Sequence, residues 1–481
     1  MKNQIHKINY LFWGLLLFLL PITSLPLTAK LLRSSMVAAP SIILMGFLLV
    51  FWLVPRILKQ KNLYFSKPLF LFLVFSILSS FTAYFLDIPL QKNLSLIHTQ
   101  TEGLITLFIG FGFFIIISNF ITTDRILIKT IQIIAISMIP LFIWSAIQLV
   151  SWMVFGAYSD TLLNIQSLLS TSGNLYRGRI TGFAFEPSWF AHTLTIFYIP
   201  LWLGLSIQNI SVFHNKILKI SFENILLFFS IIFLIFTKSR IGLVSLAFMS
   251  VYLMIKIHAV LIKQGKKLVL HSFKVNLSNF YISGILVIIY IVGLVTSIFF
   301  ISKFDKRMEN LLNPATYQNQ QFSSIANEFQ VAERVMYWQA GWRVFNDYPI
   351  LGVGLGNSGF FFEEKLSSFT WALDEPRNIF YREDYLPNNK NLWTKILSET
   401  GVTGFSMFFI WLVLIWSQAN LLKRDTNPLY QSIGYAGLFA IIAFVFEGFS
   451  IDSFALPYYW LIAGFVSAVY QYLYLSPRKS E

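Results

Sequence analysis

Cysteine is absent from this sequence of 481 residues, and charged residues are scarce. A chain without cysteine forms no disulfide, uses no thiolate nucleophile and builds no cysteine-ligated zinc site. Charged residues make up 12% of the chain, whereas hydrophobic residues make up 56%. A soluble chain of this length would fold into roughly two to four domains with charged surfaces. The composition therefore argues against a soluble protein.

The apolar residues also lack the alternation of an amphipathic strand and fall instead in long blocks. Residues 69–86, 104–121 and 282–301 are free of charge. A helix needs roughly 20 such residues to cross a hydrocarbon core of about 30 Å. Only helices and closed barrels satisfy every backbone group in lipid, and a barrel requires alternation. The sequence thus predicts an all-α polytopic membrane protein.

About twelve transmembrane helices are expected, with one large periplasmic helical loop between the ninth and the tenth. They are predicted near residues 9–27, 36–54, 68–86, 103–121, 131–153, 188–207, 222–236, 240–260, 280–301, 392–418, 430–447 and 454–475. Lys2 and Lys7 before the first run are also typical of a signal peptide, but no small-residue cleavage site is evident. Three parts result: residues 1–301 with nine helices, the loop 302–390, and residues 391–481 with three helices.

Lysine and arginine are concentrated in the loops on one side of this arrangement. The positive-inside rule then places both termini in the cytoplasm of a bacterial inner membrane. A formal net charge of +14 would suggest a nucleic-acid partner in a soluble domain. Because most of this charge lies in orienting loops, membrane lipids are the expected partners and nucleic acid is not.

Four positive residues break this rule, because they lie on the side predicted to face outward. Arg177 and Arg179 precede the sixth predicted helix, and Lys238 and Arg240 occupy a very short turn. An arginine guanidinium presents a planar fork of donors that matches phosphate. The alternative is snorkelling or contact with lipid headgroups at the membrane surface. With Arg334 nearby in the long loop, the pattern favours a site for an anionic lipid headgroup.

The segment that leads into the sixth predicted helix carries Glu186 directly before Pro187. Proline suits the first turn of a helix, and a carboxylate there lies at the positive end of the helix dipole. Glu186 is therefore a helix-capping charge or, in the functional interpretation, a proton acceptor tuned by Arg179. His192 in the same helix is either a buried packing residue or a second, less favoured base.

The long loop, residues 302–390, is predicted to form a small helical subdomain. Residues 333–346 predict a helix with an apolar stripe at helical spacing. The stripe consists of Val335, Trp338, Trp342 and Phe345. Three glycines at 352, 354 and 356 look like a fragment of a nucleotide loop, but no strand–helix context surrounds them. A tight turn at the membrane surface is the favoured interpretation.

Two further features of this region have structural alternatives. Lys395 and Glu399 are spaced i,i+4, so an ion pair inside the tenth helix is the favoured interpretation. The aromatic residues of the loop can stack on sugar rings or simply pack the subdomain.

Taken together, these elements resemble the O-antigen ligase and polymerase superfamily of bacterial envelope polysaccharide enzymes. The matching segments are Arg-Gly-Arg-Ile-Thr-Gly-Phe-Ala-Phe-Glu-Pro-Ser-Trp-Phe-Ala (177–191), Thr-Lys-Ser-Arg-Ile-Gly (237–242), Arg334 with Trp338 and Pro349-Ile-Leu-Gly-Val-Gly-Leu-Gly, and Asn391-Leu-Trp followed by Glu399-Thr-Gly. They occur in family order, around the same pattern of spans and one large loop. The resemblance covers most of the chain, although each motif is short.

The resemblance implies transfer of a glycan from an undecaprenyl-diphosphate carrier to a hydroxyl acceptor, without a metal or other cofactor. It implies that Arg179, Arg240 and Arg334 bind the diphosphate, and Arg177 and Lys238 are predicted to join them. Trp338, Asn391 and Trp393 are the predicted glycan contacts.

One departure from the family pattern separates two branches. Ligases carry a His-Asn pair before the tenth span; here Asn391 matches, whereas Lys390 occupies the histidine position. None of the six histidines lies in the long loop: they are His6, His98, His192, His214, His258 and His271. The resemblance therefore favours the polymerase branch.

The predicted function is an inverting polymerase of lipid-linked repeat units, with Glu186 as the first candidate base and His192 as the second. Its expected partners are the undecaprenyl-diphosphate-linked oligosaccharide donor, a glycan acceptor and a chain-length regulator. Ligation of a finished glycan, transport, and a non-catalytic scaffold are the alternatives. Transporters place polar residues near the bilayer midplane and often show two related halves, whereas these cations gather at one surface.

Overall fold

Helices dominate the structure, a computed structural model that describes residues 2–34, 37–59, 63–214, 216–217, 220–273, 277–304, 309 and 332–475. In these ranges the only strands are β1 (Lys216–Ile217) and β2 (Ile220–Ser221), which form an antiparallel pair. The prediction of an all-α protein is confirmed. Of the predicted loop 302–390, residues 305–308 and 310–331 lie outside the described part of the chain.

The N-terminal half forms a succession of helices, two of which contain a π-helical segment. In chain order these elements are α1 (Lys2–Phe18), α2 (Pro26–Leu32), α3 (Pro40–Leu48), the π segment η1 (Leu49–Leu53), α4 (Val54–Leu58), α5 (Lys67–Thr82), the 3₁₀ turn η2 (Ala83–Phe85), α6 (Leu96–Phe120), α7 (Asp124–Phe155), α8 (Asp160–Leu169), α9 (Pro187–Thr193), the π segment η3 (Leu194–Tyr198) and α10 (Ile199–Ile207). Each π segment joins its flanking helices into one longer rod.

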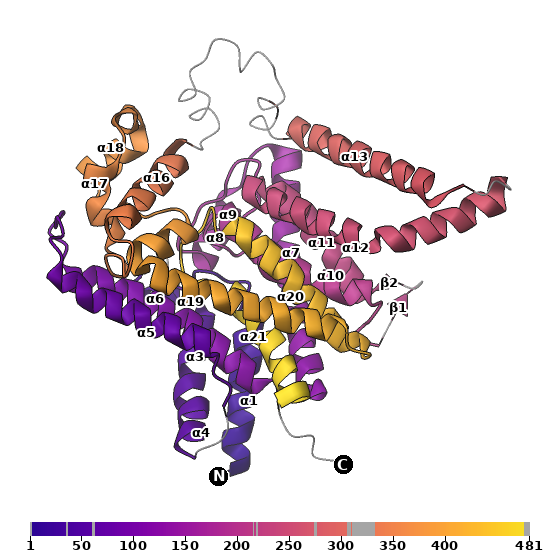
Figure 1. Cartoon of the computed structure of the whole chain (residues 1–481), viewed down its shortest axis with the longest axis horizontal. Coiled ribbons are helices and arrows are strands. Elements are labelled where there is room, and N and C mark those ends of the chain that lie inside the picture. The colour runs from indigo at the N-terminus through magenta and orange to yellow at the C-terminus, as the bar shows by residue number, and fades with distance from the viewer. Residues whose placement is uncertain are drawn as a thin grey trace.

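The C-terminal half continues with long helices on either side of a group of short ones. The elements are α11 (Phe222–Thr237), α12 (Arg240–Phe273), α13 (Asn279–Phe304), α16 (Ala332–Asp347), η5 (Ser358–Phe361), α17 (Phe362–Lys365), η6 (Ser368–Ala372), α18 (Asp374–Tyr381), α19 (Leu392–Lys423), α20 (Pro428–Glu447), α21 (Tyr458–Tyr470) and η7 (Gln471–Leu475). In Figure 1, α1 begins and the last turns of the chain end at the bottom, whereas α16–α18 lie at the top.

Nine helices in the described ranges are long and apolar enough to cross a membrane. They span Pro40–Leu58, Lys67–Phe85, Leu96–Phe120, Asp124–Phe155, Pro187–Ile207, Arg240–His271, Asn279–Phe299, Leu392–Lys423 and Pro428–Glu447. Two shorter apolar helices, Lys7–Phe18 and Phe222–Thr237, coincide with further predicted spans. The chain is therefore a multi-pass membrane protein, and the count of twelve spans stays a prediction.

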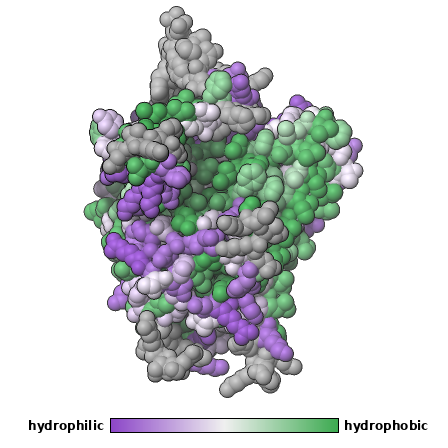
Figure 2. Space-filling view, turned by 90° about the vertical axis from the view of Figure 1, so that its right-hand side faces the viewer, coloured by the Kyte–Doolittle hydropathy of each residue, from purple (hydrophilic) through white to green (hydrophobic). Residues whose placement is uncertain are grey.

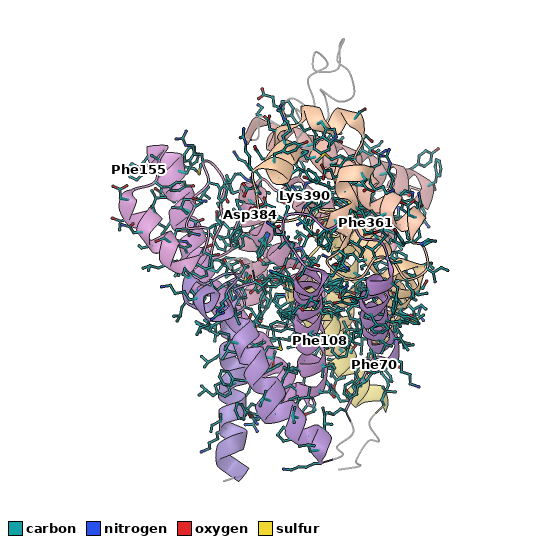
Figure 3. The ribbon with its side chains drawn as sticks, turned by 90° about the vertical axis from the view of Figure 1, so that its left-hand side faces the viewer. Phe70, Phe108, Phe155, Phe361, Asp384 and Lys390 are labelled. Atoms are coloured by element: carbon teal, nitrogen blue, oxygen red, sulfur yellow. The ribbon has the colours of Figure 1, made fainter. Side chains whose placement is uncertain are left out.

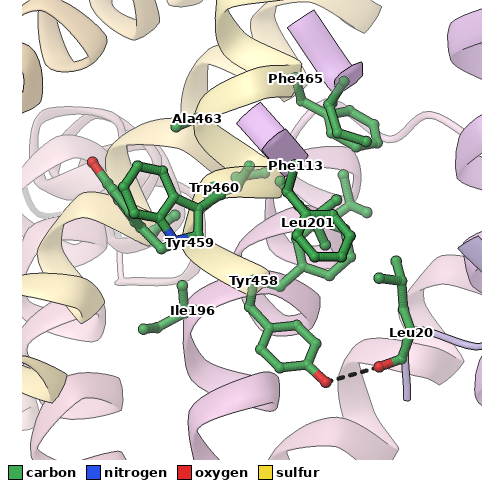
Figure 4. Close-up of a cluster of buried hydrophobic side chains, with 14 of the residues drawn as sticks. Leu20, Phe113, Ile196, Leu201, Tyr458, Tyr459, Trp460, Ala463 and Phe465 are labelled. Atoms are coloured by element: carbon green, nitrogen blue, oxygen red, sulfur yellow. Dashed lines mark hydrogen bonds between the residues drawn. The ribbon is translucent and has the colours of Figure 1, made fainter. Parts of the chain in front are cut away.

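The main core is built around α21, which is buried on nearly all sides. Gly110 of α6 lies directly over Trp460, and a Cβ there would approach the indole to 2.3 Å. Small residues let membrane helices come this close. Tyr458 donates a hydrogen bond of 2.8 Å to the carbonyl of Leu20, which ties α21 to the end of α1 (Figure 4). The last helix thus anchors distant parts of the chain to one another.

Residues 332–390 form most of a second hydrophobic core, to which Ala83 and Ile88 from the segment after α5 also contribute. The predicted helix in this region is confirmed as α16, but its buried face is not the predicted stripe. The buried residues are Ala332, Met336, Tyr337, Ala340, Gly341 and Val344, whereas Trp342 is 49% exposed. The small residues Ala340 and Gly341 allow α16 to approach its neighbours. Because the predicted stripe consists of large apolar side chains, it did not include them.

The surface of the bundle is broadly apolar. Figure 2 shows apolar side chains over a wide part of the face that carries α12 and α13, with hydrophilic side chains gathered to one side and below. Phe280, Ile288 and Phe299 on α13 are each more than half exposed. Such a surface is what a helix presents to hydrocarbon, since its backbone is satisfied internally.

Candidate active site

A cavity of about 710 Å³ opens where α6, α9, α16 and α19 meet the segment after α20. Its lining contains charged side chains of both signs. The carboxylates are Glu102, Glu186, Asp384, Glu399 and Asp452, and the cations are Arg334, Lys390 and Lys395. Figure 3 shows Asp384 and Lys390 between the α16–α18 region above and the helices that carry Phe70 and Phe108 below. The structure thus joins one residue of the predicted diphosphate site with the first candidate base.

Glu186 lies at the N-cap of α9, with Pro187 in the first turn as predicted. Its side chain makes no capping hydrogen bond to the helix backbone. Instead the carboxylate accepts a hydrogen bond from the Ser188 hydroxyl and lines the cavity. A proton acceptor needs this kind of access to a substrate hydroxyl.

His192 does not line the large cavity. It is 4% exposed and borders a neighbouring cavity of about 20 Å³. Its Nδ1 lies 3.5 Å from Oε2 of Glu447, and Glu447 is fully buried at the end of α20. The histidine therefore faces a buried carboxylate, a contact that no sequence motif indicated.

The two basic motifs that were predicted to face outward come together in the structure. The backbone amide of Ile180 donates to the carbonyl of Phe236 over 3.0 Å, and Nε of Arg179 donates to the carbonyl of Thr237 over 2.9 Å. A Cβ at Gly178, which has φ +66°, would lie 3.2 Å from Nζ of Lys238. We name Arg177, Arg179, Lys238 and Arg240 the basic cluster. Its members are contributed by the loop before α9 and by the turn between α11 and α12.

Tyr176 connects the basic cluster to the cavity electrostatically. Burial raises the pKa of its hydroxyl, the charge of Glu186 raises it further, and Arg179 opposes the shift. Tyr176 is therefore within electrostatic range of both Arg179 of the basic cluster and Glu186 of the cavity wall.

Arg334 and Lys390 line the cavity on the side of the long loop. Nη1 of Arg334 donates to the carbonyl and the hydroxyl of Ser450, over 2.9 and 2.8 Å. Both acceptors are neutral, so these bonds hold the guanidinium without cancelling its charge. Lys390 pairs with Glu375, and its backbone amide donates to Asp452 over 3.0 Å.

The three predicted glycan contacts are engaged in protein contacts and are not among the cavity-lining residues. Asn391 caps α19, because its side chain accepts from the amides of residues 393 and 394. The indole of Trp393 donates to the carbonyl of Val445 over 3.1 Å. The indole of Trp338 donates to the carbonyl of Lys390 over 3.3 Å. These contacts fix the start of α19 against α16 and α20.

The predicted ion pair inside the tenth helix is confirmed: Nζ of Lys395 lies 3.7 Å from Oε2 of Glu399. Both residues line the cavity floor, and Oε1 of Glu399 accepts from the Ser358 hydroxyl over 2.9 Å. Glu399 is thus a buried carboxylate at the cavity, a location that its i,i+4 spacing alone could not reveal.

The three alternating glycines permit a tight turn, as predicted. Gly352, Gly354 and Gly356 all have positive φ, between 69° and 86°. The helix α19 is broken at Gly401, and the amides of Val353 and Gly354 donate to the carbonyls of residues 398 and 399. The loop therefore satisfies backbone groups that the break leaves open inside the bundle.

Asp384, which the sequence offers as a substitute base in the long loop, also belongs to the cavity wall. Ser450 and Asp452 belong to it too and were missed by the sequence analysis. Ser450 and Asp452 lie in a short polar stretch, 450–453, between two apolar runs. This polar stretch between apolar runs could have indicated residues of the cavity wall, but it matches no motif.

An apolar groove of about 790 Å³ lies between the end of α7 and α8. Its lining includes Ile147, Val150, Phe155, Tyr158 and Leu162, and Phe155 stands at the upper left in Figure 3. The Tyr158 hydroxyl donates to the carbonyl of Tyr176 over 3.1 Å, and the neighbouring Trp152 packs on Gly178. The groove therefore ends beside the basic cluster.

Comparison with known proteins gives one family match. The family model described as O-Antigen ligase matches residues 225–409, a stretch that contains Lys238, Arg240, Arg334 and Glu399. No curated protein matches the chain. The match confirms, for this stretch of the chain, the resemblance drawn from the sequence motifs.

Proposed function

We propose that this protein is a membrane glycosyltransferase that polymerises undecaprenyl-diphosphate-linked oligosaccharide repeat units into a cell-surface polysaccharide. The observation that carries the proposal is the cavity that joins Glu186 to Arg334, with the basic cluster beside it. Its volume lies within the range of about 300–1,000 Å³ that is usual for small-molecule sites. The charge bias of the loops supports a location at the outer face of the inner membrane.

The proposed donor has three chemically different parts, and three adjoining features match them. The isoprenoid chain is apolar and suits the groove between α7 and α8. The diphosphate carries negative charge and suits the basic cluster, where guanidinium groups offer paired donors. The glycan is polar and suits the cavity, whose wall supplies carboxylates, hydroxyls and the side chain of Trp189.

The proposed reaction is a single displacement at the anomeric carbon of the donor glycan. A hydroxyl of the acceptor sugar gives its proton to Glu186 as its oxygen forms the new glycosidic bond. The bond between the anomeric carbon and the diphosphate breaks, and undecaprenyl diphosphate leaves with the electron pair. Attack opposite the leaving group inverts the anomeric configuration. The cations of the basic cluster stabilise the negative charge that develops on the diphosphate.

Ligation of a finished glycan to a lipid or protein acceptor is the second candidate. The description of the matching family as O-Antigen ligase favours it. The two functions use the same donor and differ in the acceptor. Lys390 at the position of the ligase histidine keeps polymerisation as the first candidate.

Purified protein in lipid vesicles, incubated with lipid-linked repeat units, tests the proposal directly. Polymerisation is expected to give a ladder of lipid-linked products, each one repeat unit longer than the last. A single product, formed only when a lipid acceptor is added, would assign the chain to ligation. Consumption of no donor under either condition would contradict both candidates.

A further inference from the structure

A buried histidine and a buried carboxylate meet beside the cavity, between α9 and α20. The side chains of His192 and Glu447 are 5% and 0% exposed, and Nδ1 and Oε2 are 3.5 Å apart. Oε1 of Glu447 accepts a hydrogen bond of 2.8 Å from the Thr195 hydroxyl, one turn beyond His192. A carboxylate inside a membrane bundle is costly unless it is paired. Apolar side chains would pack these two helices at lower cost, so the pair indicates a task beyond packing.

Glu447 connects α9 to the turn that holds Arg334. After Glu447 the chain bends, and its carbonyl accepts from the amides of Ser450 and Ile451 over 2.8 and 3.1 Å. Ser450 in turn accepts both hydrogen bonds from Arg334. The side chain of Glu447 therefore fixes the turn to α9, and its backbone fixes the position of Ser450 within that turn.

The other end of this connection carries the candidate base. Glu186 is the N-cap of α9, and His192 lies in the same short helix. A chain of contacts thus runs from Glu186 along α9 to His192 and Thr195, then through Glu447 and Ser450 to Arg334. The two ends of this chain of contacts face the same cavity. The small cavity beside His192 shares three lining residues, Ile451, Ser453 and Leu456, with the large one.

We propose that Glu447, paired with His192 and hydrogen-bonded to Thr195, is a positioning residue that sets the placement of Glu186 relative to Arg334. This inference rests on the proposed function, in which Glu186 accepts a proton from the acceptor hydroxyl while Arg334 holds the reacting glycan from the other wall of the cavity. Displacing a catalytic group by about 1 Å can cost on the order of 100-fold in rate. Glu447, which we call the strut because it fixes the distance between Glu186 and Arg334, therefore affects turnover. It leaves the binding of the donor to the basic cluster intact.

The kinetic test is Glu447→Gln, which keeps the size of the side chain and removes its charge. We expect kcat to fall about 10- to 100-fold, while KM for the lipid-linked donor changes less than about twofold. In an Arg334→Ala background the same change should lower kcat less than about threefold, because the group that it positions is gone. An equal loss of kcat in both backgrounds would overturn the proposal, as would an unchanged kcat.

The matched control is Glu223→Gln. Glu223 is also fully buried, on α11, and accepts a hydrogen bond of 2.8 Å from the amide of Val212. Glu223→Gln removes a carboxylate from a similarly buried position that does not connect Glu186 to Arg334. The kcat of this variant should therefore stay within about twofold of the wild-type value. If Glu447→Gln fails to fold, Thr195→Val removes only the hydroxyl. A kcat loss of about three- to tenfold is then expected, and no loss would contradict the strut.

A distance measurement separates this inference from the proposed function. Because the chain has no cysteine, spin labels can be attached at Trp189→Cys and Phe449→Cys alone. These positions report on the start of α9 and on the turn after α20. Glu447→Gln should shift or broaden the distance between the labels, whereas Glu223→Gln should not. Polymer formation is measured on unlabelled protein with Trp189 and Phe449 intact. A shifted distance, together with no polymer from the unlabelled wild type, would refute the function and keep the strut; normal polymerisation by unlabelled Glu447→Gln with an unshifted distance would refute the strut.

Discussion

The cavity and the basic cluster lie side by side but differ in how their charges are arranged. The cavity wall mixes carboxylates with cations, and two of its cations are paired, Lys390 with Glu375 and Lys395 with Glu399. The basic cluster gathers four cationic side chains from two distant segments, on backbone bonds between residues 179–180 and 236–237. Carboxylates among cations fix the geometry of the cavity wall, whereas four cationic residues drawn from two segments concentrate positive charge in one place.

This difference separates two tasks that the sequence analysis had combined in one site. The basic cluster has the composition of an anion site and lies next to an apolar groove. The cavity has the composition of a polar reaction chamber, with a carboxylate on one wall and Arg334 on another. In the proposed function, the cluster holds the leaving group and the cavity holds the two sugars that react.

The largest effect is expected in the cavity, for Glu186→Gln. The amide keeps the size of the side chain but cannot take the proton, and loss of a general base costs about 10²- to 10⁴-fold in rate. The initial rate of polymer formation from purified donor measures this. The exposed Glu364 on α17 provides a control, because Glu364→Gln removes a carboxylate far from the cavity wall. Equal rates for wild type and Glu186→Gln would return this residue to a helix-capping role.

The next effect is expected in the basic cluster, for Arg179→Lys and Arg240→Lys. Lysine keeps the charge and loses the bidentate fork. Loss of a charge-assisted contact in the transition state is on the order of 2–4 kcal/mol, or roughly 30- to 1,000-fold. Turnover of the lipid-linked donor is the measurement, and Arg33→Ala on an exposed loop is the control. Near-normal turnover for both lysine variants would favour snorkelling over diphosphate recognition.

A smaller effect is expected in the groove beside the cluster, for Val150→Trp. The larger side chain fills the groove, so KM for a donor with a full-length isoprenoid chain should rise about tenfold, or about 1.4 kcal/mol. A donor analogue with a much shorter chain should show less than about a twofold change. Ile143→Trp, on an exposed part of α7 outside the groove, is the control. The same increase in KM for both donors would remove the isoprenoid chain from this groove.

The smallest effect concerns Glu333, beside Arg334 on α16. Burial raises the pKa of Glu333 from its ordinary 4.5 to about 7, with Glu375 adding to the shift and Lys390 opposing it. The folded state therefore holds this proton more tightly than the unfolded state, so the stabilisation is full at low pH and is lost as pH rises through about 7. The Tm of the wild type should fall more between pH 5 and 8 than that of Glu333→Gln. Parallel pH profiles would contradict this assignment.

The helices could be predicted because lipid imposes a simple requirement on sequence. Each predicted span overlaps a helix, since long apolar runs leave no other way to satisfy the backbone. The breaks within helices were harder to see. The π segments after Leu48 and Thr193 and the break at Gly401 depend on neighbouring helices and loops that supply or relieve hydrogen bonds.

The site could be predicted only where short motifs carried it. Arg179, Arg240, Arg334 and Glu186 could be selected as candidates because basic residues and a proline-preceding carboxylate are unusual at those places. Glu447, Ser450 and Asp452 were missed, because their importance comes from contacts with residues far away in the chain. The separation of the basic cluster from the cavity was also invisible, because it depends on how α9, α11 and α16 pack.

The structure of the Glu186→Gln protein with lipid-linked donor bound would show directly whether the cavity binds the glycan and the basic cluster binds the diphosphate. The variant should bind the donor and turn it over slowly enough to be trapped. We expect glycan density in the cavity between residue 186 and Arg334, and diphosphate density against Arg179 and Arg240. The isoprenoid chain should lie in the groove between α7 and α8. Glycan density outside the cavity, or a diphosphate away from the basic cluster, would contradict this expectation.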